Sequence, residues 1–234
     1  FGEEEKKAIS DVIDSGWVVM GDKTREFEQK FAEYVGAKHA VFVDSGTSAL
    51  FLAAQYLRKV MVRREVYVPS LTFVSTVEAF LNAGMNVKFA DVDRKSFCLK
   101  APTFFSVGTH LTGNRCDERY EVYDSAHRIE KDDVKDSDAI WCYSFYATKN
   151  MSTINGGMVA TNFDDVAEFV RKARDHGITQ GTQERYQKGS WEYDIEFVGW
   201  REKSDDVHAT VGLEQLKKLP AMNEARNRIV GAYN

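Results

Sequence analysis

The sequence has few prolines and cysteines, no long apolar run and no excess of basic residues. Its 234 residues include only three prolines and three cysteines. It has no apolar run near the roughly 20 residues that cross a bilayer, and its first residues lack the apolar stretch of a signal peptide. There are 31 basic against 36 acidic residues, a formal net charge of −5, so no basic excess favours nucleic acid or an anionic membrane. These absences predict a soluble cytoplasmic protein that binds neither nucleic acid nor a membrane.

The cysteines Cys98, Cys116 and Cys142 are odd in number and widely spaced, with no Cys-x-x-Cys pair. This spacing predicts neither a disulfide framework nor a structural zinc site, so we expect buried or incidental thiols. No other set of side chains has the spacing of metal ligands, and no bound metal is expected.

The sequence has enough apolar residues for a sizeable core, because 43% are hydrophobic and 12% aromatic. Strand-like and helix-like segments alternate between Lys38 and Asn162, which predicts an α/β fold with a mainly parallel sheet flanked by helices. We expect strands at 39–43, 65–68, 87–91, 120–123, 139–143 and 158–161. We expect helices at 6–15, 23–35, 48–58, 73–82, 166–176 and from 206 to the end, the last interrupted by Pro220.

Polar residues follow several of the expected strands. In an open parallel sheet the ligand site lies beyond the carboxyl ends of the strands. The segments there are Asp44-Ser45-Gly46-Thr47-Ser48, Pro69-Ser70-Leu71-Thr72-Phe73, Asp124-Ser125-Ala126-His127 and Ser144-Phe145-Tyr146-Ala147-Thr148-Lys149.

Ser45, Gly46 and Thr47 stand where a helix begins, and free backbone N–H groups with hydroxyl donors suit a phosphate there. Simple N-capping by Ser45 or Thr47 explains the same residues. Neither Gly-x-Gly-x-x-Gly after a strand nor Gly-x-x-x-x-Gly-Lys-Ser/Thr occurs, which excludes the usual dinucleotide and P-loop motifs.

Asp124, His127 and Lys149 are the candidate chemical groups. A carboxylate at a strand end favours a cationic partner, although Asp124 could equally cap a turn and His127 have an ordinary role. Lys149 is the one charged residue between Ala139 and Ala160. Desolvation there would favour its neutral amine, which can form an imine, whereas the plain alternative is a surface lysine.

Taken in order, short motifs along the whole chain resemble one family. They are Gly16-Trp17, Gly21, Phe27-Glu28, Ser45-Gly46-Thr47-Ser48-Ala49-Leu50, Pro69-Ser70-Leu71-Thr72-Phe73, Phe89-Ala90-Asp91-Val92-Asp93, Asp124-Ser125-Ala126-His127, Ser144-Phe145-Tyr146-Ala147-Thr148-Lys149, Gly156-Gly157, Arg174-Asp175-His176-Gly177 and the run from Ala209 to Pro220. The set is similar to the DegT/DnrJ/EryC1/StrS family of pyridoxal-phosphate (PLP) sugar aminotransferases, which have fold type I of the aspartate aminotransferase superfamily.

The resemblance implies that residues 1–234 form the cofactor-binding large domain of such an enzyme. Residues 1–37 would be an N-terminal helical segment, 38–177 the sheet core and 178–205 an extended arm. Residues 206–234 would begin a helix that leads to a C-terminal small domain, which is absent from this sequence.

The resemblance also implies roles for individual residues. Lys149 would bond covalently to PLP and then move the substrate proton, and Asp124 would pair with the pyridinium nitrogen. His127 and Phe73 would sandwich the ring. Gly46, Thr47 and Ser144 would hold the phosphate.

By the same resemblance, the reaction moves an amino group, usually from glutamate, to a nucleotide-linked keto-sugar, as in polysaccharide biosynthesis. A lysine at position 149 favours transamination, since some relatives with histidine there carry out dehydration. A homodimer is implied because the family's site is completed across the subunit interface. The alternatives are a noncatalytic or truncated PLP-binding relative, or another PLP reaction such as dehydration or aromatic amine formation.

Two departures from the family pattern stand out. The stretch between Asp93 and Asp124 is shorter than usual, as if a strand-helix unit were compressed or lost, although His110 keeps a His-x-x-Gly turn. Near Gly199 the family commonly has an asparagine that reaches the phosphate of the neighbouring subunit's cofactor. Here Arg201 or Lys203 could make that contact, or the segment could be a solvated arm.

Overall fold

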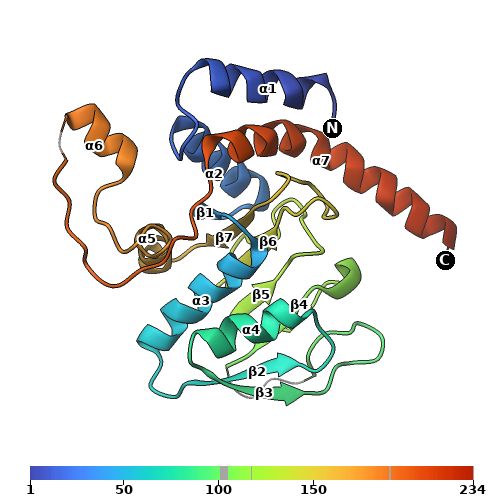
Figure 1. The fold of residues 1–234 in the computed structure, drawn as a ribbon. Helices are drawn as coiled ribbons and strands as arrows, with labels where there is room; N and C mark the ends of the chain where they lie inside the picture. The colour runs from blue at the N-terminus through green and yellow to red at the C-terminus, as the bar shows by residue number, and fades with distance from the viewer. Residues whose placement is uncertain (101–104, 117, 190, 234) are drawn as a thin grey trace.

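The computed structural model describes residues 1–100, 105–116, 118–189 and 191–233, and Figure 1 shows their arrangement. The elements in chain order are α1 (Glu3–Asp14), α2 (Asp22–Val35), β1 (His39–Val43), α3 (Gly46–Val60), β2 (Glu65–Pro69), α4 (Val74–Asn82), β3 (Asn86–Ala90), β4 (Val107–Thr109), the 3-10 helix η1 (Leu111–Gly113), β5 (Val122–Asp124), β6 (Ile140–Ser144), β7 (Gly157–Thr161), α5 (Asp164–Ala173), α6 (Thr182–Lys188) and α7 (Asp206–Tyr233).

The strands form a mainly parallel arrangement, as expected. A five-stranded sheet has the order β1-β7-β6-β5-β4, and β2 and β3 form a parallel pair beside it. A parallel bridge between Tyr67 and Ser106 links β2 to the residue just before β4. Within the described residues, β7 alone runs against the others, pairing antiparallel with both β1 and β6. The carboxyl ends of β5 and β6 therefore meet at one edge.

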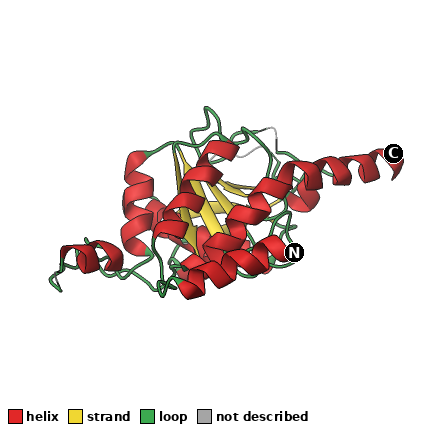
Figure 2. Ribbon diagram, turned by 90° about the horizontal axis from the view of Figure 1, so that it is seen from above, coloured by secondary structure: helices red, strands yellow, loops and turns green. Residues whose placement is uncertain are grey.

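Side chains alternate between two cores, one on each face of the sheet. Ala40 and Phe42 of β1 join a core with α2 and α7, whereas Val41 and Val43 join a core with α3, α4 and α5. Figure 2 shows the strands enclosed between helices. This double coverage fixes the register of each strand, because a slip by one residue would exchange the two faces.

Helix α7 is fastened to the N-terminal helices. Asp206 at its start accepts hydrogen bonds from the backbone N–H groups of Gly21 and Thr24 at 2.7 and 2.9 Å, which satisfies donors at the start of α2. Glu5 of α1 forms an ion pair with Lys218 at 2.7 Å. Burial would raise the pKa of Glu5, but Lys218, Gln215 and the Gly2 amide lower it to about 2. Helix α7 continues beyond the sheet at its C-terminal end (Figures 1 and 2).

The expected interruption at Pro220 is wrong, because α7 is continuous through it. Proline in a helix removes one hydrogen bond and costs roughly 3 kcal/mol. Leu213, Leu216 and Leu219 are buried against α2 and the sheet, and this packing offsets the cost.

The segment between β3 and β5, which is expected from the sequence to be shortened, is held by side chains. In its described parts, 91–100, 105–116 and 118–121, β4 and η1 are the regular elements and no α-helix occurs. Instead, the ring of Tyr123 stacks on His110 and on Trp141, with centroids 5.2 and 4.3 Å apart, respectively. Strand β4 was not predicted, since three residues containing a glycine give too little pattern.

Cys98 and Cys116 in this segment form a disulfide, with Cα atoms 5.5 Å apart. The expectation that these two thiols are unpaired is therefore wrong, whereas Cys142 is a buried free thiol as expected. The pairing depends on how the chain returns from β4, and a separation of 18 residues carries no local signal for it.

Candidate active site

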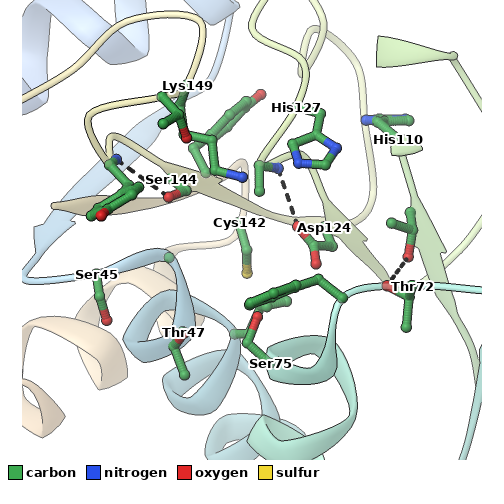
Figure 3. Close-up of a pocket in the computed structure, with 18 of the residues that line it drawn as sticks. Ser45, Thr47, Thr72, Ser75, His110, Asp124, His127, Cys142, Ser144 and Lys149 are labelled. Carbon is green, nitrogen blue, oxygen red and sulfur yellow. Dashed lines mark hydrogen bonds between the residues drawn. The ribbon is translucent and has the colours of Figure 1, made fainter. Parts of the chain in front are cut away.

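A cavity of about 400 Å³ opens at the edge where β5 and β6 end and α3 and α4 begin. It brings together residues from six segments of the sequence, and Figure 3 shows most of them. Seven predicted site residues line it: Gly46, Thr47, Phe73, Asp124, His127, Ser144 and Lys149.

Asp124, the last residue of β5, is 5% exposed. The Thr76 hydroxyl donates to its Oδ2 at 2.6 Å, and the Ala126 amide donates to its Oδ1 at 3.1 Å. These two donors fix the carboxylate and satisfy part of its hydrogen-bonding capacity while it is buried. The lone pairs that are left can accept a proton donor in the cavity.

Lys149 lies in the loop after β6 and extends toward the cavity beside Asp124 and His127 (Figure 3). Burial lowers the pKa of its ammonium, and the Asp124 carboxylate partly opposes this by favouring the charged form. The sequence predicted such a desolvated lysine, and the pKa direction agrees with that prediction. A lowered pKa increases the fraction of neutral amine, the nucleophilic form.

His127 lies across the cavity from α4. Burial, and then the Lys149 charge, lowers the pKa of its ring, with Asp124 acting in the opposite direction. The Thr112 amide donates to Nδ1 at 3.2 Å, so in the neutral ring Nε2 carries the proton. Burial thus disfavours the charged form of this ring, and the Thr112 amide selects the tautomer of the neutral form.

The opposite end of the cavity is built on the start of α3. Ser45 is the N-cap of this helix, and its Oγ accepts from the Ser48 amide at 3.0 Å. Gly46 packs so closely on β6 that an added Cβ would lie 2.7 Å from the Ser144 Cβ. Ser45 therefore caps the helix, as one interpretation of the motif predicted. Gly46, Thr47 and Ser144 line the cavity, and their role in holding a phosphate stays a prediction.

Replacing Gly46 with alanine should weaken PLP binding. The new methyl group must displace Ser144 or the start of α3, and losing one hydrogen bond to a charged phosphate costs roughly tenfold in affinity. Titration with PLP measures the change. Gly181→Ala is the matched control, because nothing lies within 4 Å of its added Cβ, and equal affinity in the two variants would contradict the prediction.

Arg201 and Lys203 do not line this cavity. Lys203 forms an ion pair with Asp175 at 2.7 Å, and both side chains are largely buried. Arg201 is exposed. Between them Glu202 points inward, so that the Ser48 hydroxyl lies between its carboxylate and that of Asp44. Burial and the Asp44 charge raise the pKa of Glu202 despite the Ser48 hydrogen bond.

Several residues of the site were not predicted from the sequence. Thr72, Ser75, Thr109 and His110 also line the cavity, and Thr76 supports Asp124 from behind. Thr72 and Thr76 are hydrogen bonded at 2.8 Å. A hydroxyl pair four residues apart at the start of a helix is a signal that could have been noticed.

His110 is fully buried with Nδ1 at 2.7 Å from the Ser125 hydroxyl. Burial, with the charges of Arg128 and Arg115, lowers its pKa to about 3. In the unfolded chain His110 is protonated near its ordinary pKa of 6.5, whereas in the folded chain it stays neutral down to about pH 3. The stabilisation is therefore complete above pH 6.5 and is lost as the pH falls toward 3.

In His110→Asn, the drop in unfolding free energy between pH 7 and pH 5 should be smaller than in the unsubstituted chain by about 2 kcal/mol. Chemical denaturation at the two pH values measures it. His176→Asn, at an exposed position, should leave the drop unchanged. An identical drop in His110→Asn would contradict the buried neutral state of this ring.

Comparison with known proteins identifies the family. The model of the DegT/DnrJ/EryC1/StrS aminotransferase family matches residues 1–111 and 123–234. The chain belongs to this family. The unmatched residues, 112–122, fall in the segment between β3 and β5.

Named relatives agree with this assignment. The spore coat polysaccharide biosynthesis protein SpsC of Bacillus subtilis is 34% identical over 261 residues, covering 100% of this chain and 66% of SpsC. DesV from S. venezuelae is 26% identical with a TM-score of 0.85, covering 99% of this chain and 66% of DesV. Spr1654 from Streptococcus pneumoniae in its PLP form is 25% identical with a TM-score of 0.85, covering 100% and 68%.

These matches confirm the predicted family and the α/β fold class. The chain spans about two thirds of the length of these relatives. Among the described residues, no helix is long and apolar enough to cross a membrane, and no three His, Cys, Asp or Glu side chains are grouped as metal ligands.

Proposed function

We propose that this chain is the cofactor-binding part of a PLP-dependent aminotransferase that moves an amino group from glutamate to a nucleotide-linked keto-sugar. The observation that carries the proposal is the shared cavity of Lys149 and Asp124. A buried carboxylate and a desolvated amine lie at one end of it, and a helix N-terminus with hydroxyl donors at the other.

The residues present fit PLP in size and chemistry. Gly46, Thr47 and Ser144 offer donors for a phosphate, which the start of α3 also favours through its dipole. Asp124 offers oxygen acceptors for a protonated ring nitrogen. Phe73 and His127 offer flat rings for the cofactor faces. PLP, when bound, supplies an electron sink next to the substrate carbon that loses its proton.

The chain's own groups then orient and move protons. Asp124, held by Thr76 and the Ala126 amide, would accept a hydrogen bond from the ring nitrogen and favour its protonated form. The Lys149 amine would take a proton from the substrate carbon and return it to the C4′ carbon of the cofactor. The lowered pKa of Lys149, caused by burial, suits a base in this role. In its neutral form, the His127 ring adds no charge to the site.

The sugar substrate is proposed on the basis of the relatives. The name of SpsC places it in polysaccharide biosynthesis, and PseC of Helicobacter pylori is an aminotransferase in the biosynthesis of pseudoaminic acid.

We also propose a homodimer. Phe73 and Tyr146 at the cavity are 67% and 54% exposed, and a second chain would cover them. Arg201, the one of the two arm cations without an ion pair in the described residues, is the candidate for the cross-subunit phosphate contact.

A PLP-binding relative without turnover is the second candidate. The segment between β3 and β5, expected to be shortened, favours this candidate. The segment contains η1 and the Thr112 amide that orients His127, so a change in its length would alter the position of His127 in the site. In this case the cofactor would bind but the amino group would not be transferred.

The two candidates differ in their reaction with glutamate. Protein loaded with PLP and mixed with glutamate should convert to the pyridoxamine form, with loss of the visible absorption band and release of 2-oxoglutarate. A stable band with no 2-oxoglutarate after long incubation would overturn the aminotransferase and favour the noncatalytic relative. A panel of nucleotide keto-sugars added to the pyridoxamine form then identifies the acceptor by recovery of the band.

A further inference from the structure

Two side chains of α7 contact the backbone of both loops that carry the proposed catalytic groups. Asn223 donates from Nδ2 to the carbonyl oxygen of Ile129 at 2.7 Å. Arg226 donates from Nη2 to the carbonyl oxygen of Asn150 at 2.9 Å. Ile129 is two residues after His127, and Asn150 directly follows Lys149.

The two contacts are joined to each other. Arg226 donates from Nη1 to the Asn223 Oδ1 at 3.2 Å. A continuous path of hydrogen bonds therefore runs from the Lys149 loop through Arg226 and Asn223 to the loop after β5. The Asn223 side chain is buried, with 6% of its surface exposed, so losing its partner would leave a polar group unsatisfied.

Helix α7 is a rigid base for such a path. It is anchored to α2 through Asp206 and to α1 through Lys218. Leu216 and Leu219, about two to three turns before Arg226, are buried in the core that includes Ile129. The Lys149 loop has internal hydrogen bonds at both of its ends, such as the Lys149 amide to the Tyr146 carbonyl at 2.9 Å and the Thr153 amide to the Phe145 carbonyl at 3.0 Å. The Arg226 contact adds a bond to its middle, at the carbonyl of Asn150.

We propose that Asn223 and Arg226 are positioning residues, which hold the Lys149 loop and the loop of Asp124 and His127 in a fixed mutual arrangement through α7. The role assigned to these loops rests on the proposed function. Arg226, Lys149 and His127 also line one small hollow beside the main cavity, so a shift of Arg226 would change the surroundings of Lys149 and His127.

The test uses variants with matched controls on the same helix. Arg226→Lys keeps the charge but cannot donate to the Asn150 carbonyl and the Asn223 Oδ1 from two nitrogens. Asn223→Asp keeps the shape but removes the Nδ2 donor to the Ile129 carbonyl. Arg228→Lys is the control for the first, because Arg228 bonds Glu224 within α7 at 2.9 Å. Asn227→Asp, at an exposed position, is the control for the second.

Hydrogen exchange on the full chain without cofactor gives the first readout. Amides of residues 146–154 should exchange about fivefold faster in Arg226→Lys, since one net hydrogen bond contributes roughly that factor. Amides of residues 126–130 should respond likewise in Asn223→Asp. The controls should match the unsubstituted chain. Unchanged exchange in both loops would overturn the proposal.

The pH dependence of Lys149 acylation in the same samples gives the second readout. A loosened loop admits water, so the pKa of Lys149 should rise toward its ordinary value in Arg226→Lys, at a temperature where the variant is folded. A mere loss of global stability would leave it unchanged, and that result would count against a positioning role. Both readouts are made without PLP or glutamate, so their outcome is independent of whether the chain transaminates.

Discussion

Lys149→Ala is expected to abolish covalent attachment of PLP and to lower the rate of glutamate half-transamination by at least about 10³-fold, because the variant lacks both the nucleophile and the base. Lys149 is the lysine that lines the cavity. Its side chain is partly buried but contributes little packing, so the variant should keep its fold. Absorbance and stopped-flow measurements check the two effects.

Lys131→Ala is the control, since Lys131 is exposed and does not line the cavity. A second check is chemical rescue, in which a small primary amine restores part of the rate to Lys149→Ala but not to Lys131→Ala. A Lys149→Ala protein that retains the visible band and its rate would remove Lys149 from the mechanism.

Asp124→Ala should lower the same rate by about 10² to 10⁴-fold, the range in which a single proton-holding group contributes. Without this carboxylate the ring nitrogen loses its acidic partner and the electron sink weakens. The loss should appear in the rate of proton removal more than in PLP affinity, because the phosphate contacts at Gly46, Thr47 and Ser144 are unchanged.

A second effect follows from charge. The Asp124 carboxylate raises the pKa of Lys149 against the effect of burial, so in Asp124→Asn the pKa of Lys149 should fall further. Acylation of the cofactor-free protein as a function of pH measures this. Asp138→Asn, whose exposed side chain lies 3.7 Å from Arg119, should have no effect. A rise in the pKa of Lys149 in Asp124→Asn would contradict the electrostatic description of the site.

The sequence predicted the parts of the fold whose signal is local. Strand β1 was placed at the residues observed, because Ala40-Val41-Phe42-Val43 is an uninterrupted β-forming run before a helix cap. Strand β4 was missed, since Val107-Gly108-Thr109 is a strand only because β5 pairs with it. Cys98 and Cys116 meet for a similar reason, through a turn of the chain that no local pattern encodes.

The lining of the cavity was predicted to the same extent. Residues at or after strand ends, such as Asp124 and Lys149, could be expected to share one cavity because the topology of a parallel sheet brings strand ends together. The Thr72 and Thr76 pair could have been noticed, but not the hydrogen bond from Thr76 to Asp124, because the two residues lie 48 positions apart. Asn223 and Arg226 contact backbone carbonyls, and a carbonyl has no side-chain identity that a sequence pattern could match.

The central claim is that one lysine of this cavity binds PLP. The most direct measurement is to load the full chain with PLP, reduce it with borohydride, digest it and locate the added mass by mass spectrometry. The account predicts one phosphopyridoxyl group per chain, attached to Lys149. A label spread over surface lysines, or placed on any other single residue, would contradict it.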